Sequence, residues 1–128
     1  MICLDTSFII DFLKERKEAI EFMKKNTEEV FTTEVNVFEI FIGIYTKENY
    51  EREEAIAIGF FNSIHVASSN GWGVKSAKIL SVLIKDGNLI EENDCCIASI
   101  MLANGCERII TRNKKHFERI KGIKVISY

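Results

Sequence analysis

Short apolar runs alternate along the chain with longer stretches in which apolar residues recur every three or four positions. A short apolar run is typical of a buried strand, and the longer spacing is typical of a helix with an apolar face. The pattern predicts strands over residues 2–4, 30–32, 64–66, 108–111 and 124–126. It predicts helices over residues 6–13, 17–25, 33–45, 50–61, 72–85, 93–103 and 116–120. Predicted N-caps, whose side-chain oxygens can accept from a free backbone N–H, are Thr6 or Ser7, Thr33 and Asn93.

The alternation of strands with helices predicts an α/β fold with a parallel sheet that helices cover on both faces. A chain of 128 residues suits one domain with one core, and no linker or repeat divides it. In sheets of this kind, functional sites form beyond the carboxyl ends of the strands. Polar side chains that follow an apolar run are therefore the first candidates for function.

Composition excludes several classes of protein. With 47% hydrophobic and 28% charged residues, the chain has the make-up of a folded globular protein rather than a disordered one. Met1 leads directly into an apolar strand, and no long apolar run exists, so we expect no signal peptide, no membrane span and a cytoplasmic location. The four cysteines form no CxxC pair and have apolar neighbours, which favours reduced core thiols over a zinc site.

The net charge of -2 conceals an uneven distribution. Residues 105–128 contain seven Lys or Arg and only two acids, whereas the rest of the chain contains ten bases and seventeen acids. A basic end on an acidic body could hold a phosphate chain, although a solvated surface would have the same composition.

Three carboxylates lie in apolar surroundings. Asp5 directly follows the first strand, and Glu39 lies within the almost wholly apolar stretch 37–42. Asp94 lies in the first turn of a helix that continues as Cys-Cys-Ile-Ala. Asp5 could be a turn residue, and Asp94 could be an acid that the helix dipole stabilises. Glu39 is harder to explain in this way, because a carboxylate among apolar neighbours is costly unless it is paired or binds a metal.

The three carboxylates together predict a metal site. Clustered carboxylates repel one another, and a divalent cation removes that repulsion. Oxygen ligands without Cys or His select Mg²⁺ or Mn²⁺ rather than zinc. Such a site suits phosphoryl transfer, since the metal can activate a water and neutralise the phosphate.

Three stretches of the chain resemble the PIN-domain family. ICLDTSFIIDFL resembles its first strand and Asp, and TTEVNVFEIFIGI resembles its helix with a Glu followed four residues later by a Gly, here Gly43. ENDCCIASIMLANGCERIITRNKKHFERIKGIKVI resembles its last half, in which an Asp opens a helix and a strand ends in Thr before an Asn or Asp. The order, spacing and length of these stretches are most similar to the compact VapC-type toxins of bacteria and archaea.

The resemblance implies a three-layer α/β/α sandwich around a parallel sheet of four or five strands. It implies an endoribonuclease toxin that cleaves structured RNA, such as transfer or ribosomal RNA, with Mg²⁺ or Mn²⁺. The implied partners are a VapB-like antitoxin, which blocks the site, and a second copy of the chain. Asp5, Glu39 and Asp94 would be the catalytic and metal-binding acids, with Asp5 contacting both the water and the metal.

One departure from the family pattern concerns residues 111–117, where a fourth acid is common and none is present. Asn113 can offer a neutral oxygen to the metal or hold a metal-bound water, so we expect one-metal chemistry. Candidate RNA-binding residues beside it are Arg112, Lys114, Lys115 and His116, although His116 could equally be a surface histidine. Ser7 and Thr111 are supporting hydroxyls, expected as caps or structural hydrogen-bond donors.

The segment from Thr33 to Phe61 has apolar residues on more than one helix face. A neighbouring helix could cover the second face, but a patch of this size favours a two-fold symmetric homodimer.

Two other functions compete with the nuclease. A phosphatase of the haloacid-dehalogenase kind needs a second Asp two residues after the first, where this chain has Ser7. A PIN-like domain without activity, which binds only RNA or a partner, would explain the missing fourth acid, whereas the three intact acids argue for an enzyme.

Overall fold

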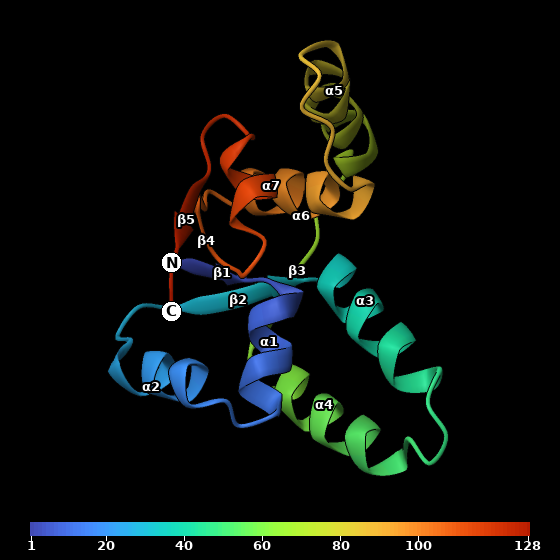
Figure 1. The fold of residues 1–128 in the computed structure, drawn as a ribbon, viewed down its shortest axis with the longest axis vertical. Helices are drawn as coiled ribbons and strands as arrows, with labels where there is room; N and C mark the ends of the chain where they lie inside the picture. Colours follow the sequence, from blue (N-terminus) through green and yellow to red (C-terminus); the bar gives the residue numbers. More distant parts are fainter.

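The computed structural model describes residues 1–128 as a five-stranded parallel sheet between two layers of helices (Figure 1). All strand pairs are parallel, and the strand order is β3-β2-β1-β4-β5. The strands are β1 (Ile2–Leu4), β2 (Val30–Thr33), β3 (His65–Ala67), β4 (Arg108–Ile110) and β5 (Lys124–Ile126). The predicted α/β/α sandwich with a parallel sheet is therefore confirmed.

Seven helices connect and cover the strands. They are α1 (Thr6–Leu13), α2 (Lys17–Lys25), α3 (Glu34–Tyr45), α4 (Glu51–Ser63), α5 (Trp72–Lys85), α6 (Glu92–Ala103) and α7 (Lys114–Glu118). In Figure 1, α1 to α4 lie on one side of the sheet and α5 to α7 on the other. Each strand is only three or four residues long, so the helices supply most of the buried surface.

Alternate residues of the strands enter two separate cores. Ile2 and Leu4 of β1 pack with α1 to α4, whereas Cys3, between them, packs with α6 and α7. Ile109 and Ile110 of β4 divide between the two cores in the same way. Because successive side chains of a strand point to opposite faces, an apolar run without alternation indicates a strand buried on both sides.

The strand order places β1 at the centre, between β2 and β4. From β1 the chain first builds outward through β2 and β3, and then returns to the other edge of β1 to form β4 and β5. The reversal leaves a crevice at the carboxyl ends of β1 and β4, which is where parallel α/β sheets bind their ligands. Asp5 and Thr111 directly follow these two strands.

Several predicted boundaries are wrong by one or two residues. The third strand begins at His65, and the last helix spans Lys114–Glu118 instead of residues 116–120. Neither Thr6 nor Ser7 caps α1, whose N-cap is Asp5. Likewise Asn93 lies inside α6, whose N-cap is Glu91. Thr6 and Ser7 instead line a cavity beside α1, and the Asn93 side chain is directed toward Glu39.

Two helices leave much of their apolar surface exposed. In α3 the buried side chains are Asn36, Ile40 and Ile44, while Phe38, Ile42 and Tyr45 are exposed. In α5 the only buried residues are Ser76 and Leu83, and both pack toward α6. Figure 1 shows α5 projecting away from the sheet beyond the end of α6. None of the helices could cross a membrane.

Candidate active site

A cavity of about 340 Å³ lies beyond the carboxyl ends of β1 and β4. All three predicted acids line it, together with Asn113 and Arg112. The remaining lining side chains include Ser7, Thr6 and Glu91, so the wall is almost entirely polar. The structure therefore brings together residues that are up to 108 positions apart in the sequence, counting from Asp5 to Asn113.

Asp5 is the most buried of the acids, with 1% of its surface exposed. Its Oδ2 accepts hydrogen bonds from Thr111 Oγ1 at 2.5 Å and Ser7 Oγ at 3.3 Å, and its Oδ1 accepts one from Asn36 Nδ2 at 3.2 Å. No cationic side chain pairs with it. Burial raises the pKa of the Asp5 carboxyl, and the hydroxyl and amide donors oppose that rise.

Asn36 connects Asp5 to the start of α3. Its Oδ1 accepts from the backbone N–H and the hydroxyl of Thr33, while its own N–H donates to Thr33 Oγ1, which forms a capping box. Its Nδ2 donates to Asp5 Oδ1 and, at 3.0 Å, to Thr6 Oγ1. One fully buried amide thus caps the helix that bears Glu39 and holds the side chain of Asp5.

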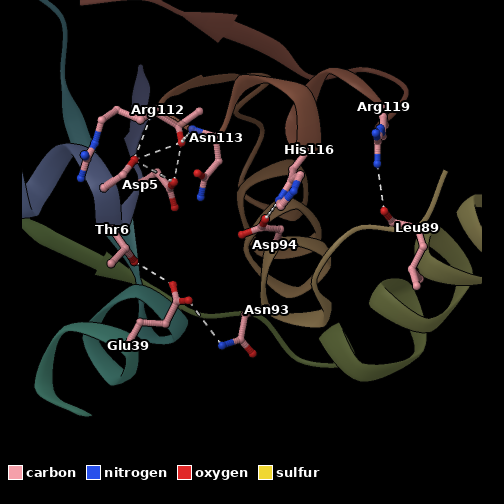
Figure 2. Close-up of polar contacts among 12 residues, drawn as sticks. Asp5, Thr6, Glu39, Leu89, Asn93, Asp94, Arg112, Asn113, His116 and Arg119 are labelled. Atoms are coloured by element: carbon pink, nitrogen blue, oxygen red, sulfur yellow. Dashed lines mark hydrogen bonds and ion pairs between the residues drawn. The ribbon is translucent and has the colours of Figure 1, made fainter. Parts of the chain in front are cut away.

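Glu39 lies on the opposite wall of the cavity, on α3, between Thr6 and Asn93 (Figure 2). Thr6 Oγ1 donates to its Oε1 at 2.7 Å, and Asn93 Nδ2 lies 3.4 Å from its Oε2. Burial raises the pKa of the Glu39 carboxyl, and the nearby Asp5 raises it further against the hydrogen bond from Thr6. A chain of donors therefore runs from Asn36 through Thr6 to Glu39.

Asp94 projects from the first turn of α6 and is 3% exposed. His116 Nδ1 lies 2.7 Å from Asp94 Oδ2, so this imidazole contacts an acid of the site (Figure 2). Burial raises the pKa of Asp94 to about 6, the contact with His116 opposes the rise, and Asp5 and Glu39 add to it. Mutual repulsion among the three carboxylates is therefore present in the metal-free protein.

The remaining predicted residues lie at the edge of this cavity. Arg112, Asn113, Lys114, Lys115 and His116 line an adjoining cavity of about 530 Å³ together with Glu118. The backbone of this loop is fixed by hydroxyls, since Arg112 N–H donates to Ser7 and Asn113 N–H donates to Thr111. Ser7 and Thr111 thus form structural hydrogen bonds, which was one of the two predicted roles; neither has the other predicted role, that of a helix cap.

Sequence reasoning missed three residues of the site: Asn36, Thr6 and Asn93. Each lies in the first turn of a helix, where short polar residues commonly bond to the free backbone groups. The sequence does not show which distant carboxylate such a side chain contacts. One available signal was Asn36 itself, because an amide inside a largely apolar helix needs buried partners.

The donor set fits a hard divalent cation in kind. Two buried carboxylates, Asp5 and Asp94, and the half-buried Glu39 line one polar cavity, and all three offer oxygen ligands. The side chains, however, do not form a preformed metal site: no group of three Asp, Glu, His or Cys residues lies close enough together to coordinate one ion. The four cysteines offer no alternative site, since each is free and none lines the cavity.

The model of the PIN domain matches residues 2–123, nearly the whole chain. This chain belongs to the PIN-domain family. Within that family it is of the VapC type: it is 30% identical to Ribonuclease VapC1 of Methanocaldococcus jannaschii, over 97% of this chain and 85% of the relative.

Solved structures of the same fold include toxin–antitoxin complexes. VapBC-1 from nontypeable Haemophilus influenzae matches with a TM-score of 0.84 and 26% identity, covering 99% of this chain and 98% of the other. The DNA-bound VapBC from Salmonella typhimurium matches with a TM-score of 0.87 and 24% identity, covering 98% and 96%. The PIN-domain assignment made from the three sequence stretches is confirmed.

Proposed function

We propose that this protein is a metal-dependent endoribonuclease and the toxin of a toxin–antitoxin pair. The observation that supports this most directly is the polar cavity where Asp5, Glu39 and Asp94 meet at the carboxyl ends of β1 and β4. A relative that is 30% identical over nearly the whole chain bears the name of a ribonuclease. The two supports are independent, because one is geometric and the other is sequence similarity.

The three acids are the proposed ligands of one Mg²⁺ or Mn²⁺ ion, with Asn113 as a neutral oxygen donor at the edge. When bound, such a cation lowers the pKa of a water, neutralises phosphate charge and stabilises the leaving oxygen. Asp5 contributes the most firmly held carboxylate, since three side chains donate to it. Thr6 and Asn93 orient Glu39, and His116 orients Asp94.

The proposed substrate is structured RNA such as transfer or ribosomal RNA. Arg112, Lys114 and Lys115 line the cavity that adjoins the acids, so a phosphate chain bound there would lead toward the carboxylates. A basic surface beside an acidic centre is the arrangement that a phosphodiesterase needs, because the chain must be held while the scissile phosphate approaches the acids.

Cleavage of mixed cellular RNA, followed on gels with Mg²⁺, with Mn²⁺ and with EDTA, tests the proposal. The unaltered protein should cleave only with metal, and Asp5→Asn should lose cleavage. Asp86→Asn, which removes an exposed carboxylate just beyond α5, is the matched control and should cleave normally. Cleavage by Asp5→Asn would refute the site. Normal RNA binding without any cleavage by the unaltered protein would favour the inactive binding module.

The proposed partner is a VapB-like antitoxin, and the structure offers it an apolar groove of about 400 Å³ between α1, α3 and α4. The groove is lined by Leu13, Ile40, Ile44 and Ile56, and it shares Ile10 and Glu39 with the acidic cavity. An apolar antitoxin segment in this groove would therefore end at the acids and cover them.

Gly43 allows a test, because it lines the groove and a side chain added there meets open space. Gly43→Leu should weaken antitoxin binding, measured by calorimetry, and leave RNA cleavage in place. Gly59→Leu adds the same side chain to α4 outside the groove and is the control. Equal antitoxin affinity of the Gly43→Leu variant and the unaltered protein would place the antitoxin elsewhere.

A further inference from the structure

One carboxylate oxygen of Asp11 is shared by two side chains that lie far away in the sequence. Tyr128 OH donates to Asp11 Oδ2 at 2.6 Å, and Arg112 Nε lies 3.2 Å from the same oxygen. The side chain of Asp11 is 15% exposed, so the pair is partly shielded from water. The Tyr128 ring packs edge-on against Phe8, with ring centroids 4.8 Å apart.

Arg112 occupies the junction of three cavities. It lines the acidic cavity, the basic cavity of Lys114 and Lys115, and a third cavity of about 300 Å³ that Tyr128 and Lys114 also line. Its backbone is held by the bond from its N–H to Ser7 Oγ at 2.9 Å. The Nε contact places the guanidinium beside Asp11 and Tyr128, while 57% of the Arg112 side chain stays exposed to solvent.

Tyr128 and Arg112 contact the same oxygen of Asp11. A free carboxylate tends to take an arginine in a bidentate pair through two of its N–H groups. Here Tyr128 occupies part of the hydrogen-bonding capacity of Oδ2, and Arg112 keeps a single contact through Nε. Burial and the bond to Asp11 raise the pKa of Tyr128, so the hydroxyl remains a donor across the physiological range.

We propose that Asp11 and Tyr128 are positioning residues that hold the Arg112 guanidinium at this junction, with its Nη groups free to bind a phosphate of the RNA. The inference rests on the proposed function, since it names a group that would receive a phosphate of the RNA beside the acidic cavity. A free arginine side chain on a loop would have to be ordered each time RNA binds, and that ordering weakens affinity. The contacts of Asp11 and Tyr128 reduce this cost in advance.

A double-mutant cycle on RNA affinity tests the proposal. The probe is a fluorescein-labelled RNA hairpin of mixed sequence, bound in EDTA so that no cleavage occurs and followed by fluorescence anisotropy. Arg112→Ala should weaken binding and reduce the salt slope by about 0.7, the value for one phosphate contact on single-stranded RNA. Tyr128→Phe keeps the ring on Phe8, removes only the hydroxyl, and should weaken binding about two- to tenfold, which corresponds to ordering one long side chain.

The decisive result is non-additivity. If Tyr128 acts through Arg112, Tyr128→Phe should have no further effect in a protein that already carries Arg112→Ala or Arg112→Lys, since lysine keeps the charge but lacks Nε. Tyr50→Phe, which removes the hydroxyl of a tyrosine on the far side of the fold, is the control and should bind normally. Thermal melting verifies that each variant is folded.

Two outcomes would overturn the proposal: normal binding by Tyr128→Phe, or an equal loss with and without Arg112. Neither would affect metal-dependent cleavage, which is measured separately with Asp5→Asn. Failure of the unaltered protein to cleave RNA, in contrast, would refute the proposed function even if Arg112 and Tyr128 proved coupled in binding.

Discussion

Thr6 links the hydrogen bonds around Asp5 to those around Glu39. It accepts from Asn36, which also holds Asp5, and it donates to Glu39 at 2.7 Å. Residues that orient metal ligands in this way typically change metal affinity by 10- to 100-fold when they are removed. The position of Glu39 should therefore depend on a hydroxyl that contacts no substrate.

Thr6→Val has nearly the same shape but no hydroxyl, and we expect it to weaken Mn²⁺ binding by about 10- to 100-fold. Thr6→Ser restores the hydroxyl and should restore the affinity. Isothermal titration calorimetry with Mn²⁺ alone measures both variants without RNA. If the valine variant binds Mn²⁺ as tightly as the serine variant, Glu39 is not positioned in this way.

Asp94 gives the metal-free protein a characteristic pH dependence. Its pKa is raised to about 6 in the folded state, above an unfolded value of about 3.9. The folded protein therefore holds this proton more tightly. The resulting stabilisation is fully present below about pH 4 and is lost as the pH rises through 6.

Asp94→Asn is neutral at every pH and can still accept from His116. In EDTA at pH 7 we expect it to be more stable than the unaltered protein by on the order of 2 kcal/mol, and at pH 4 to be equal to it. Adding Mg²⁺ at pH 7 should stabilise the unaltered protein and have much less effect on the variant. Urea unfolding at both pH values measures this. A variant that is less stable at pH 7 without metal would contradict the repulsion among the acids.

The acids of the candidate site could be predicted from the sequence when taken together, whereas the residues that support them could not. Asp5, Glu39 and Asp94 stand out because each is a carboxylate in apolar sequence surroundings. Asn36 and Thr6 look like ordinary helix-cap residues, and only the packing of α1 against α3 shows that they reach carboxylates. A hydrogen bond across 31 or 33 residues has no local signature in the sequence.

At the scale of single elements, the errors of sequence reasoning concern helix ends and faces. The strands and helices lie near their predicted places because short apolar runs and helical spacing are strong local patterns. The predicted N-caps of α1 and α6 were wrong because Ser7 and Asn93 bond to site residues instead of capping. The helix α3 is apolar on more than one face, so periodicity alone could not select its buried side.

The helix α5 is held to the molecule by little more than α6. Only Ser76 and Leu83 of its fourteen residues are buried, whereas seven residues of α6 are. Segments with few buried contacts open without unfolding the rest of the protein. We expect amide hydrogens of α5 to exchange well before those of α6, measured by hydrogen–deuterium exchange and mass spectrometry. Equal protection would mean that another contact, such as a second subunit, covers α5.

At the scale of the whole molecule, α3 and α4 present several exposed large apolar side chains. They are Phe38, Ile42, Tyr45, Ile56 and Ile58, each 46–58% exposed. The sequence predicted more apolar residues on these helices than one buried face needs, and the structure leaves these five side chains uncovered. An exposed patch of this kind marks an interface, and a two-fold dimer is the simplest way for one chain to cover it.

We therefore expect a dimer at micromolar concentration in analytical ultracentrifugation, with twice the mass of 14.7 kDa. Ile42→Glu, which changes an exposed residue of α3, should yield a monomer because it would place a charge in the apolar interface. Val74→Glu, on the equally exposed α5, is the control and should remain dimeric. The reverse result, dissociation by Val74→Glu alone, would move the interface to α5.

The sequence predicted a parallel sheet but not the order of the strands within it. Parallel strands buried on both faces follow from the short apolar runs, whereas the order β3-β2-β1-β4-β5 depends on pairings between distant segments. The pairing of Cys3 with Ile109, for example, depends on which edge of β1 remains free after β2 has paired. No local pattern specifies that choice.

The central position of β1 also has a consequence during synthesis on the ribosome. One edge of β1 can pair with β2 early, but the other edge waits for β4, and Asp5 waits for Thr111, which lies 106 residues later. At about 5 to 20 residues per second, this interval lasts roughly 5 to 20 seconds. During this interval the emerging chain contains Asp5 but not Thr111, which hydrogen-bonds to it, and Asp94 is also synthesised late in the interval. A nascent chain therefore lacks the complete candidate site, and the RNA cleavage proposed for that site, until the segment that follows β4 has emerged.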